Sequence, residues 1–333
     1  MALRLDNDWL WDFWVARDGD AFHLFYLRAP RSLRDADLRH HSAVVGHAVS
    51  SDLRSWELLP DPLGRGRVGS FDDRATWTGS VHRFRDRWVM AYTGIADRDD
   101  WTVQRIGFAY SRDLMSWTRG GPVLEADRRW YEKRGPEVAH EAWRDPYLFE
   151  LDGRLHMFVT ARAKDGPPDG RGVVAHAWTD DLSTWEVGPP VAGPGDFWTY
   201  EVTQLAFVGG RWRLLFSAQA HEHSAVRLGR AGVVAESGTH LLSADAPLGP
   251  FELDGDAFLV GGHDARYYAG RLVETDAGPQ FLAWLDRGAE GEFVGSLSDP
   301  MPVSVGGDGR LAVATPTLTT GVVLVSSSAR AGG

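Results

Sequence analysis

Aromatic and aliphatic positions follow turn residues in a hairpin pattern that recurs five times along the chain. In each copy a glycine or aspartate turn precedes an apolar strand, and the copies span residues 19–27, 85–94, 152–162, 209–219 and 277–286. The aligned position recurs at intervals of about 57 to 69 residues and is occupied by Phe22, Trp88, Leu155, Trp212 and Phe281. This period fits one four-stranded propeller blade, so the pattern predicts five repeats of short strands.

A second pattern recurs in phase with the first. A polar turn leads into an aromatic residue and a further strand at residues 51–57, 111–119 and 179–187, with a diverged copy at 243–253. Two markers that share one period favour a five-bladed β-propeller over an irregular sandwich. No linker interrupts the repeats, which predicts a single all-β domain with approximate blades at 9–70, 71–135, 136–195, 196–260 and 261–325. We expect the ring to close by pairing strands from both chain ends in one blade, with residues 311–325 supplying the last strand.

Composition supports this class and excludes several partners. The 333 residues include 38 glycines, 17 prolines and 15 tryptophans, a mixture that favours strands and turns over long helices. A net charge of −11 without a basic stripe argues against nucleic acid or an anionic membrane as a partner. No stretch approaches the apolar length of a membrane span, and the beginning of the sequence lacks a signal-peptide pattern. With no cysteine either, we expect a cytoplasmic protein without thiolate chemistry.

Acidic residues occupy the start of several repeats. Asp12, Thr78 and Asp145 each precede the aligned position by the same interval, and Glu201 precedes it by one residue more. The first strand of every blade lines the central channel of a propeller, so these side chains should converge. Buried charges are costly unless they are paired or used. Carboxylates beside Trp and Tyr, as here, are typical of carbohydrate sites, where aromatic faces pack on sugar rings.

Glycosidic cleavage needs one carboxylic acid to protonate the leaving oxygen and one carboxylate to attack the sugar or activate water. Glu201 is the candidate acid, because the aromatic residues just before it disfavour a charged side chain. Asp12, on the first strand, is the candidate nucleophile. Asp145 follows Arg144, whose charge should keep it ionised to stabilise the transition state.

Short motifs at these positions resemble the retaining β-fructosidases of glycoside hydrolase families 32 and 68. WRDP at 143–146 resembles the Arg-Asp-Pro motif of this clan, and WDFW at 11–14 is similar to the nucleophile motif of family 68. WTGS at 77–80 and RYYAG at 266–270 resemble segments of the second and fifth blades, with Arg266 where the clan has an aspartate. The resemblance implies a five-bladed propeller with Asp12 as nucleophile, Asp145 as transition-state stabiliser and Glu201 as acid/base. We expect the propeller without the β-sandwich that family 32 enzymes append.

Other residues near these motifs are expected to contact the substrate. They are Trp11, Trp77, Ser80, Arg144, Trp198, Gln204 and Tyr268. We expect no cofactor and no metal, since His221 and His223 fit a solvated turn better than a metal site. Glu141 lies close to the expected mouth. The charged insertion at 28–41 either shapes the pocket or contacts a neighbouring subunit, which leaves a homo-oligomer open.

These observations predict a retaining glycosidase that cleaves or transfers β-fructofuranosyl groups of sucrose or small fructo-oligosaccharides. The first alternative is an inverting arabinosidase or xylosidase of the family 43 type, which also uses three acids of a five-bladed propeller. The second is a sugar-binding propeller without catalytic activity.

Overall fold

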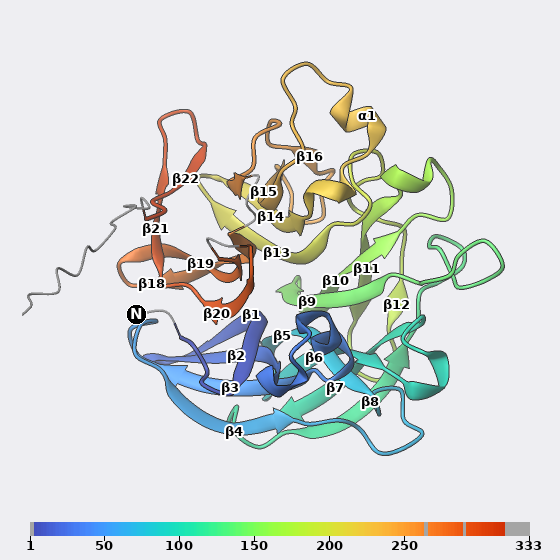
Figure 1. The fold of residues 1–333 in the computed structure, drawn as a ribbon, viewed down its shortest axis with the longest axis vertical. Coiled ribbons are helices and arrows are strands. Elements are labelled where there is room, and N and C mark those ends of the chain that lie inside the picture. Colours follow the sequence, from blue (N-terminus) through green and yellow to red (C-terminus); the bar gives the residue numbers. More distant parts are fainter. Residues whose placement is uncertain (1–2, 263–265, 289–290, 317–333) are drawn as a thin grey trace, which may run out of the picture.

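The computed structural model describes residues 3–262, 266–288 and 291–316. Their strands form five antiparallel sheets that succeed one another in chain order, and Figure 1 shows the sheets arranged around a common centre. The predicted five-bladed β-propeller is confirmed. The helical segments of the described residues are short, and none has the length and apolar character needed to cross a membrane.

Each blade is a meander whose strands pair in sequence order. The first sheet contains β1 (Asp8–Asp18), β2 (Ala21–Pro30), β3 (Val44–Ser50) and β4 (Glu57–Leu63). The second contains β5 (Ala75–Phe84), β6 (Arg87–Ile95), β7 (Gln104–Ser111) and β8 (Thr118–Leu124). The third contains β9 (Trp143–Leu151), β10 (Arg154–Arg162), β11 (Gly172–Thr179) and β12 (Glu186–Val187).

The last two blades carry one extra strand each. The fourth contains β13 (Glu201–Val208), β14 (Arg211–Ala218), β15 (Ser237–Ala244) and β16 (Glu252–Leu253), and β17 (Val260–Gly262) also pairs with β15. The fifth contains β18 (Tyr267–Thr275), β19 (Gly278–Arg287), β21 (Met301–Val305) and β22 (Leu311–Val313), and β20 (Phe293–Leu297) also pairs with β19. The connections hold η1 (Arg31–Leu33), η2 (Ala36–His41), η3 (Asp97–Asp99), η4 (Pro168–Gly170), η5 (Ala220–Glu222) and α1 (Ala225–Leu228).

The first strands of adjacent blades contact one another around the ring, and β18 contacts β1. The expected closure through residues 311–325 is wrong where it can be seen, because β22 pairs with β21 inside the fifth blade. Residues 317–325 lie outside the described part of the chain. Instead, among the described residues, the fifth blade meets the first through side chains and one backbone hydrogen bond. The ring of Trp9 packs edge-on against Phe293 with centroids 6.0 Å apart, and the Leu297 N–H donates to the Leu3 carbonyl.

The second sequence pattern corresponds to a tight turn before the fourth strand. Asp52, Asp113 and Asp181 each accept hydrogen bonds from backbone N–H groups two and three residues later. The leucine after each aspartate has a positive φ of 61° to 68°. Such side-chain hydrogen bonds offset the strain of the left-handed backbone, which explains why the same residue types recur at this place in three blades.

Candidate active site

A β-bulge interrupts the first strand of every blade at the same place. The register shifts after Trp11, Trp77, Arg144, Glu201 and Tyr268, in β1, β5, β9, β13 and β18 respectively. In each blade the residue before the bulge pairs with a residue on the second strand. In all five blades that partner lies the same number of positions further along the chain. A bulge redirects the side chains around it. This repeated irregularity therefore aims one pair of residues per blade at the centre.

The residues directed inward form two tiers around a cavity of about 540 Å³. The five residues before the bulges line it, and so do Asp12, Thr78, Asp145 and Val202 at the bulges themselves. Asp145, Val202 and Ala269 have positive φ values of 55°, 52° and 48°. Hence the residue equivalent to Asp145 in the fourth blade is Val202, and Glu201 belongs to the other tier. Glu201 precedes the aligned position of its blade by one residue more than Asp145 does, because it stands before the bulge and Asp145 stands at the bulge.

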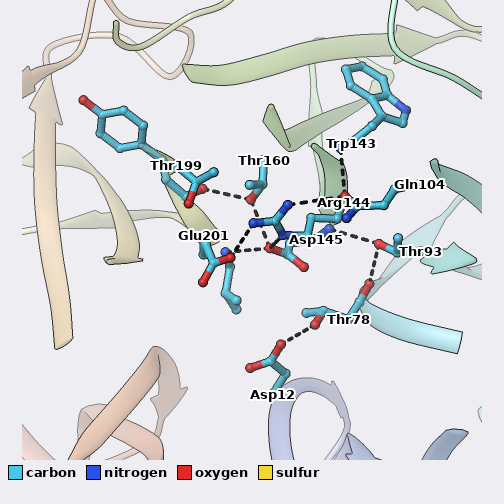
Figure 2. A network of polar contacts seen from close by, with 12 residues as sticks. Asp12, Thr78, Thr93, Gln104, Trp143, Arg144, Asp145, Thr160, Thr199 and Glu201 are labelled. Atoms are coloured by element: carbon cyan, nitrogen blue, oxygen red, sulfur yellow. Dashed lines mark hydrogen bonds and ion pairs between the residues drawn. The ribbon is translucent and has the colours of Figure 1, made fainter. Parts of the chain in front are cut away.

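Three acids from three blades, Asp12, Asp145 and Glu201, face this one cavity. Figure 2 shows that hydrogen bonds connect the first two. The Thr78 hydroxyl donates to Asp12, and the Thr78 carbonyl accepts from Thr93 Oγ1 at 3.2 Å. Thr93 Oγ1 in turn accepts from the Asp145 N–H at 3.0 Å. The backbone and side chains of adjacent blades thereby fix the relative positions of these two aspartates.

Asp12 is held through both of its carboxylate oxygens. Thr78 donates to Oδ2, and the Trp284 indole N–H donates to Oδ1 at 3.0 Å. Burial raises the pKa of Asp12, the hydrogen bond from Thr78 opposes this rise, and the negative charge of Glu201 adds to it. The result is an oriented, desolvated carboxylate at the cavity wall.

Asp145 is 3% exposed and accepts hydrogen bonds from the Val202 N–H at 3.2 Å and the Thr160 hydroxyl at 3.1 Å. Burial raises its pKa to about 7, although the charge of Arg144 lowers it. Arg144 Nε lies 3.7 Å from Asp145 Oδ2, and its charge opposes the effect of burial only in part. The predicted influence of Arg144 on Asp145 is therefore present but is weaker than that of burial.

Glu201 takes the closer contact with Arg144. Arg144 Nη2 lies 2.5 Å from Glu201 Oε1, and the Tyr268 hydroxyl donates to Oε2 at 2.8 Å. Arg144, Glu201 and Tyr268 occupy the same tier in consecutive blades. They form a hydrogen-bonded arc along one side of the cavity, which the sequence did not reveal because each motif was interpreted within its own blade.

Glu222 is a fourth acid at the cavity that the sequence analysis did not select. Its carboxylate accepts from the Thr199 hydroxyl at 2.6 Å and the Gln219 N–H at 2.7 Å. Burial raises its pKa to about 7, and the charge of Glu201 contributes. Glu222 lies between His221 and His223, in the segment predicted to be a solvated turn. That prediction is wrong for Glu222 and His223, each of which is 6% exposed. His223 Nε2 instead lies 2.8 Å from the Glu236 carbonyl.

The insertion at 28–41 forms one wall of the cavity. The His40 ring lies edge-on to Trp11 and Trp77, at centroid distances of 6.1 and 5.9 Å, and the His40 carbonyl accepts from the Trp77 indole at 2.7 Å. The Arg39 guanidinium lies over Trp11, 5.6 Å from the ring centroid. Of the two roles left open for this insertion, the structure shows the first, which is shaping the pocket.

Two tryptophans at the cavity are partly exposed. Trp198 is 44% exposed and Trp101 is 37% exposed, and both line the cavity. The buried Arg162 lies 3.5 Å from the centroid of the Trp198 ring, and its Nη1 donates to the Trp198 carbonyl at 2.7 Å. The Arg162 guanidinium thus packs on one face of the Trp198 indole, while the Trp198 side chain remains accessible.

Two predicted contact residues do not line the cavity. The Ser80 hydroxyl accepts from the Leu148 N–H at 2.8 Å and ties β5 to β9. The Gln204 side chain donates to the Leu272 carbonyl at 2.8 Å and accepts from the Leu272 N–H at 2.7 Å, which ties β13 to β18. Both side chains join neighbouring blades and are already hydrogen-bonded, so we correct their expected role from substrate contact to blade pairing.

The sequence matches a known family over most of its length. A model described as the glycosyl hydrolases family 32 N-terminal domain matches residues 14–288. The chain belongs to this family. Membership confirms the resemblance to the β-fructosidase clan and sets aside the family 43 alternative, which fold and repeat spacing alone could not exclude.

Relatives of this family 32 chain include two bacterial proteins named sucrose-6-phosphate hydrolase. The protein from Zymomonas mobilis is 28% identical over 253 residues, which cover 72% of this chain and 46% of the relative. The protein from Bacillus subtilis is 25% identical over 275 residues, which cover 80% of this chain and 52% of the relative. The chain spans about half the length of these curated relatives.

Solved structures share the fold of this family 32 chain. An inulosucrase from Halalkalicoccus jeotgali bound to kestose superposes with a TM-score of 0.74 at 21% identity, covering 96% of this chain and 93% of that one. Bacillus subtilis levansucrase gives a TM-score of 0.72 at 12% identity, covering 92% and 86%. The likeness extends over the whole propeller.

Proposed function

We propose that this protein is a retaining glycosidase that hydrolyses or transfers β-fructofuranosyl groups of sucrose or small fructo-oligosaccharides. The observation that carries the proposal is the convergence of Asp12, Asp145 and Glu201 on one cavity in a chain of family 32. The names of the relatives, which refer to sucrose 6-phosphate, and the kestose bound to the inulosucrase support a fructoside as substrate.

In the first step Asp12 attacks C2 of the fructosyl group while the bond from C2 to the leaving oxygen breaks. Glu201 donates its proton to that oxygen, which leaves as the hydroxyl of the departing sugar. The hydrogen bonds from Thr78 and Trp284 support this role because they hold the Asp12 carboxylate in one orientation before the reaction.

In the second step the Glu201 carboxylate removes a proton from water or from the hydroxyl of an acceptor sugar. The oxygen attacks C2, the bond to Asp12 breaks, and two inversions give net retention. Positive charge develops on the fructosyl ring in both transition states. The ionised form of Asp145 stabilises this positive charge at close range from its buried position in the cavity wall.

Aromatic and polar side chains hold the sugar in this proposal. Trp11, Trp77 and Trp198 supply apolar surfaces, while Arg144 and Tyr268 donate to hydroxyl groups and orient Glu201. We further propose that the protein acts in the cytoplasm on small imported sugars, which is consistent with a sequence free of cysteine. Activity in a membrane-free cell extract, absent from the culture medium, tests the location.

The function is tested by incubating the purified protein with sucrose, a fructo-oligosaccharide, an inulin and a nitrophenyl arabinofuranoside, while NMR follows the first products. Release or transfer of fructose with retained β-configuration supports the proposal. Inverted product, or turnover of the arabinofuranoside alone, contradicts it. No turnover of any of the four favours a binding propeller.

A further inference from the structure

The acids of the cavity outnumber its cations. Six carboxylate residues line it, and the described lining holds three guanidinium groups and no lysine. The acids are Asp12, Glu141, Asp145, Glu201, Glu222 and Asp286. A phosphate monoester carries nearly two negative charges at neutral pH, and a site that binds it needs cationic donors that are free to contact it.

Each guanidinium group of the cavity already faces an acid or another acceptor. Arg144 is paired with Glu201 at 2.5 Å. Arg287, beside Asp286 in sequence, donates to the Gly291 carbonyl at 3.2 Å. Arg39 lies 3.5 Å from Asp37 and interacts electrostatically with Asp12 and Asp286. A phosphate group would therefore compete with a carboxylate for Arg144 and for Arg39, and with a backbone carbonyl for Arg287.

Asp286 is a cavity acid that the proposed reaction does not use. Asp286 lies two residues after Trp284, which holds Asp12, and both residues line the cavity. Asp286 is 7% exposed and lines the cavity. No hydrogen bond to its carboxylate is found among the residues that the structure describes. Its acceptor atoms are thus available to the hydroxyl groups of a sugar.

We propose that the cavity selects uncharged fructosides over phosphorylated ones, with Asp286 as a specificity-determining residue that accepts sugar hydroxyls and repels a phosphate. This inference rests on the proposed function and narrows its substrate class. It separates the chain from relatives whose names refer to sucrose 6-phosphate. The shared feature would be the fructosyl chemistry, and the difference would be the charge of the accepted substrate.

The test compares kcat/KM for sucrose and for sucrose 6-phosphate at low and high salt. We expect a preference for sucrose of at least about tenfold at low salt, which narrows as added salt screens the charges. Asp286→Asn keeps the shape of the side chain and should narrow the preference by about threefold or more. Asp276→Asn is the matched control, because it removes the same charge from the same blade. The Asp276 side chain is 87% exposed and is paired with Arg17.

The outcomes separate this inference from the proposed function. Equal or better turnover of sucrose 6-phosphate overturns the inference and leaves a fructosidase. If neither compound is turned over, the inference is overturned, and the proposed function falls with it if a fructo-oligosaccharide is not turned over either. If neither Asp286→Asn nor added salt changes the preference for sucrose, the preference does not arise from charge and Asp286 does not determine it.

Discussion

Arg144 contacts the acid of the neighbouring blade more closely than the acid beside it in sequence. Its guanidinium group lies 2.5 Å from Glu201 Oε1 and 3.7 Å from Asp145 Oδ2. The bulge in β9 produces this arrangement, because it turns consecutive side chains into different tiers of the cavity. Arg144 is thereby placed to orient Glu201.

Replacing Arg144 with lysine tests this orienting role. A lysine ammonium keeps the charge but cannot bridge Gln104 and Glu201 as the planar guanidinium does. We expect kcat/KM on sucrose to fall about 100-fold with the fold intact, because a misplaced acid loses its alignment with the leaving oxygen. Arg154→Lys, at a surface ion pair, is the control. Activity within about threefold of the unchanged protein would show that charge alone suffices.

The stability of the protein should depend on pH through Asp145. Because its pKa is raised from 3.8 to about 7, the folded protein binds more protons than the unfolded chain between these values. The contribution of Asp145 to stability is therefore present below pH 4 and is lost as the pH rises to about 7. Asp145→Asn removes the buried charge and should raise the Tm by about 2–4 °C at pH 8.

Thermal unfolding followed by circular dichroism at pH 5 and pH 8 measures this effect. The gain in Tm should be larger at pH 8, while turnover of sucrose is nearly abolished. An Asp145→Asn protein that is less stable than the original at pH 8 would mean that the carboxylate stabilises the fold.

Ser80 should matter for stability and not for substrate binding. Ser80→Ala leaves the buried Leu148 N–H without an acceptor, which costs about 1–3 kcal/mol of the free energy of unfolding. The kcat/KM of the folded protein should stay within about twofold, since Ser80 lies outside the cavity. Urea unfolding and steady-state kinetics measure the two effects, with the exposed Ser304→Ala as control. A large rise in KM without loss of stability would restore the substrate role.

Trp198 should contribute to substrate binding. We expect Trp198→Ala to raise KM for a fructo-oligosaccharide about tenfold, because an accessible indole at the cavity is lost. Trp198→Phe should recover part of the affinity, since a smaller ring still covers Arg162. Trp130→Ala is the control, as Trp130 is 38% exposed but does not line the cavity. An unchanged KM in Trp198→Ala would remove this residue from the binding site.

The sequence predicted the features that repeat and missed those that depend on contacts between blades. Spacing located the second strands and the inward-facing part of the first strands, because every blade uses the same hairpin and bulge, but it did not separate the two tiers. It did not show that Ser80 and Gln204 are engaged by Leu148 and Leu272, since those partners lie one blade away. Asp286 and Glu222 were missed because they lie outside the repeat position at which acids were sought.

The covalent step on Asp12 is the most direct test of the account. The protein is mixed with sucrose, quenched in acid within its turnover time, digested and analysed by mass spectrometry. We predict one fructosyl group on the peptide that contains Asp12, accumulating further in Glu201→Gln when a fructosyl substrate with a good leaving group is used. Rapid turnover with no fructosyl adduct, or an adduct on another residue, would contradict the proposal that Asp12, Asp145 and Glu201 act together on one sugar.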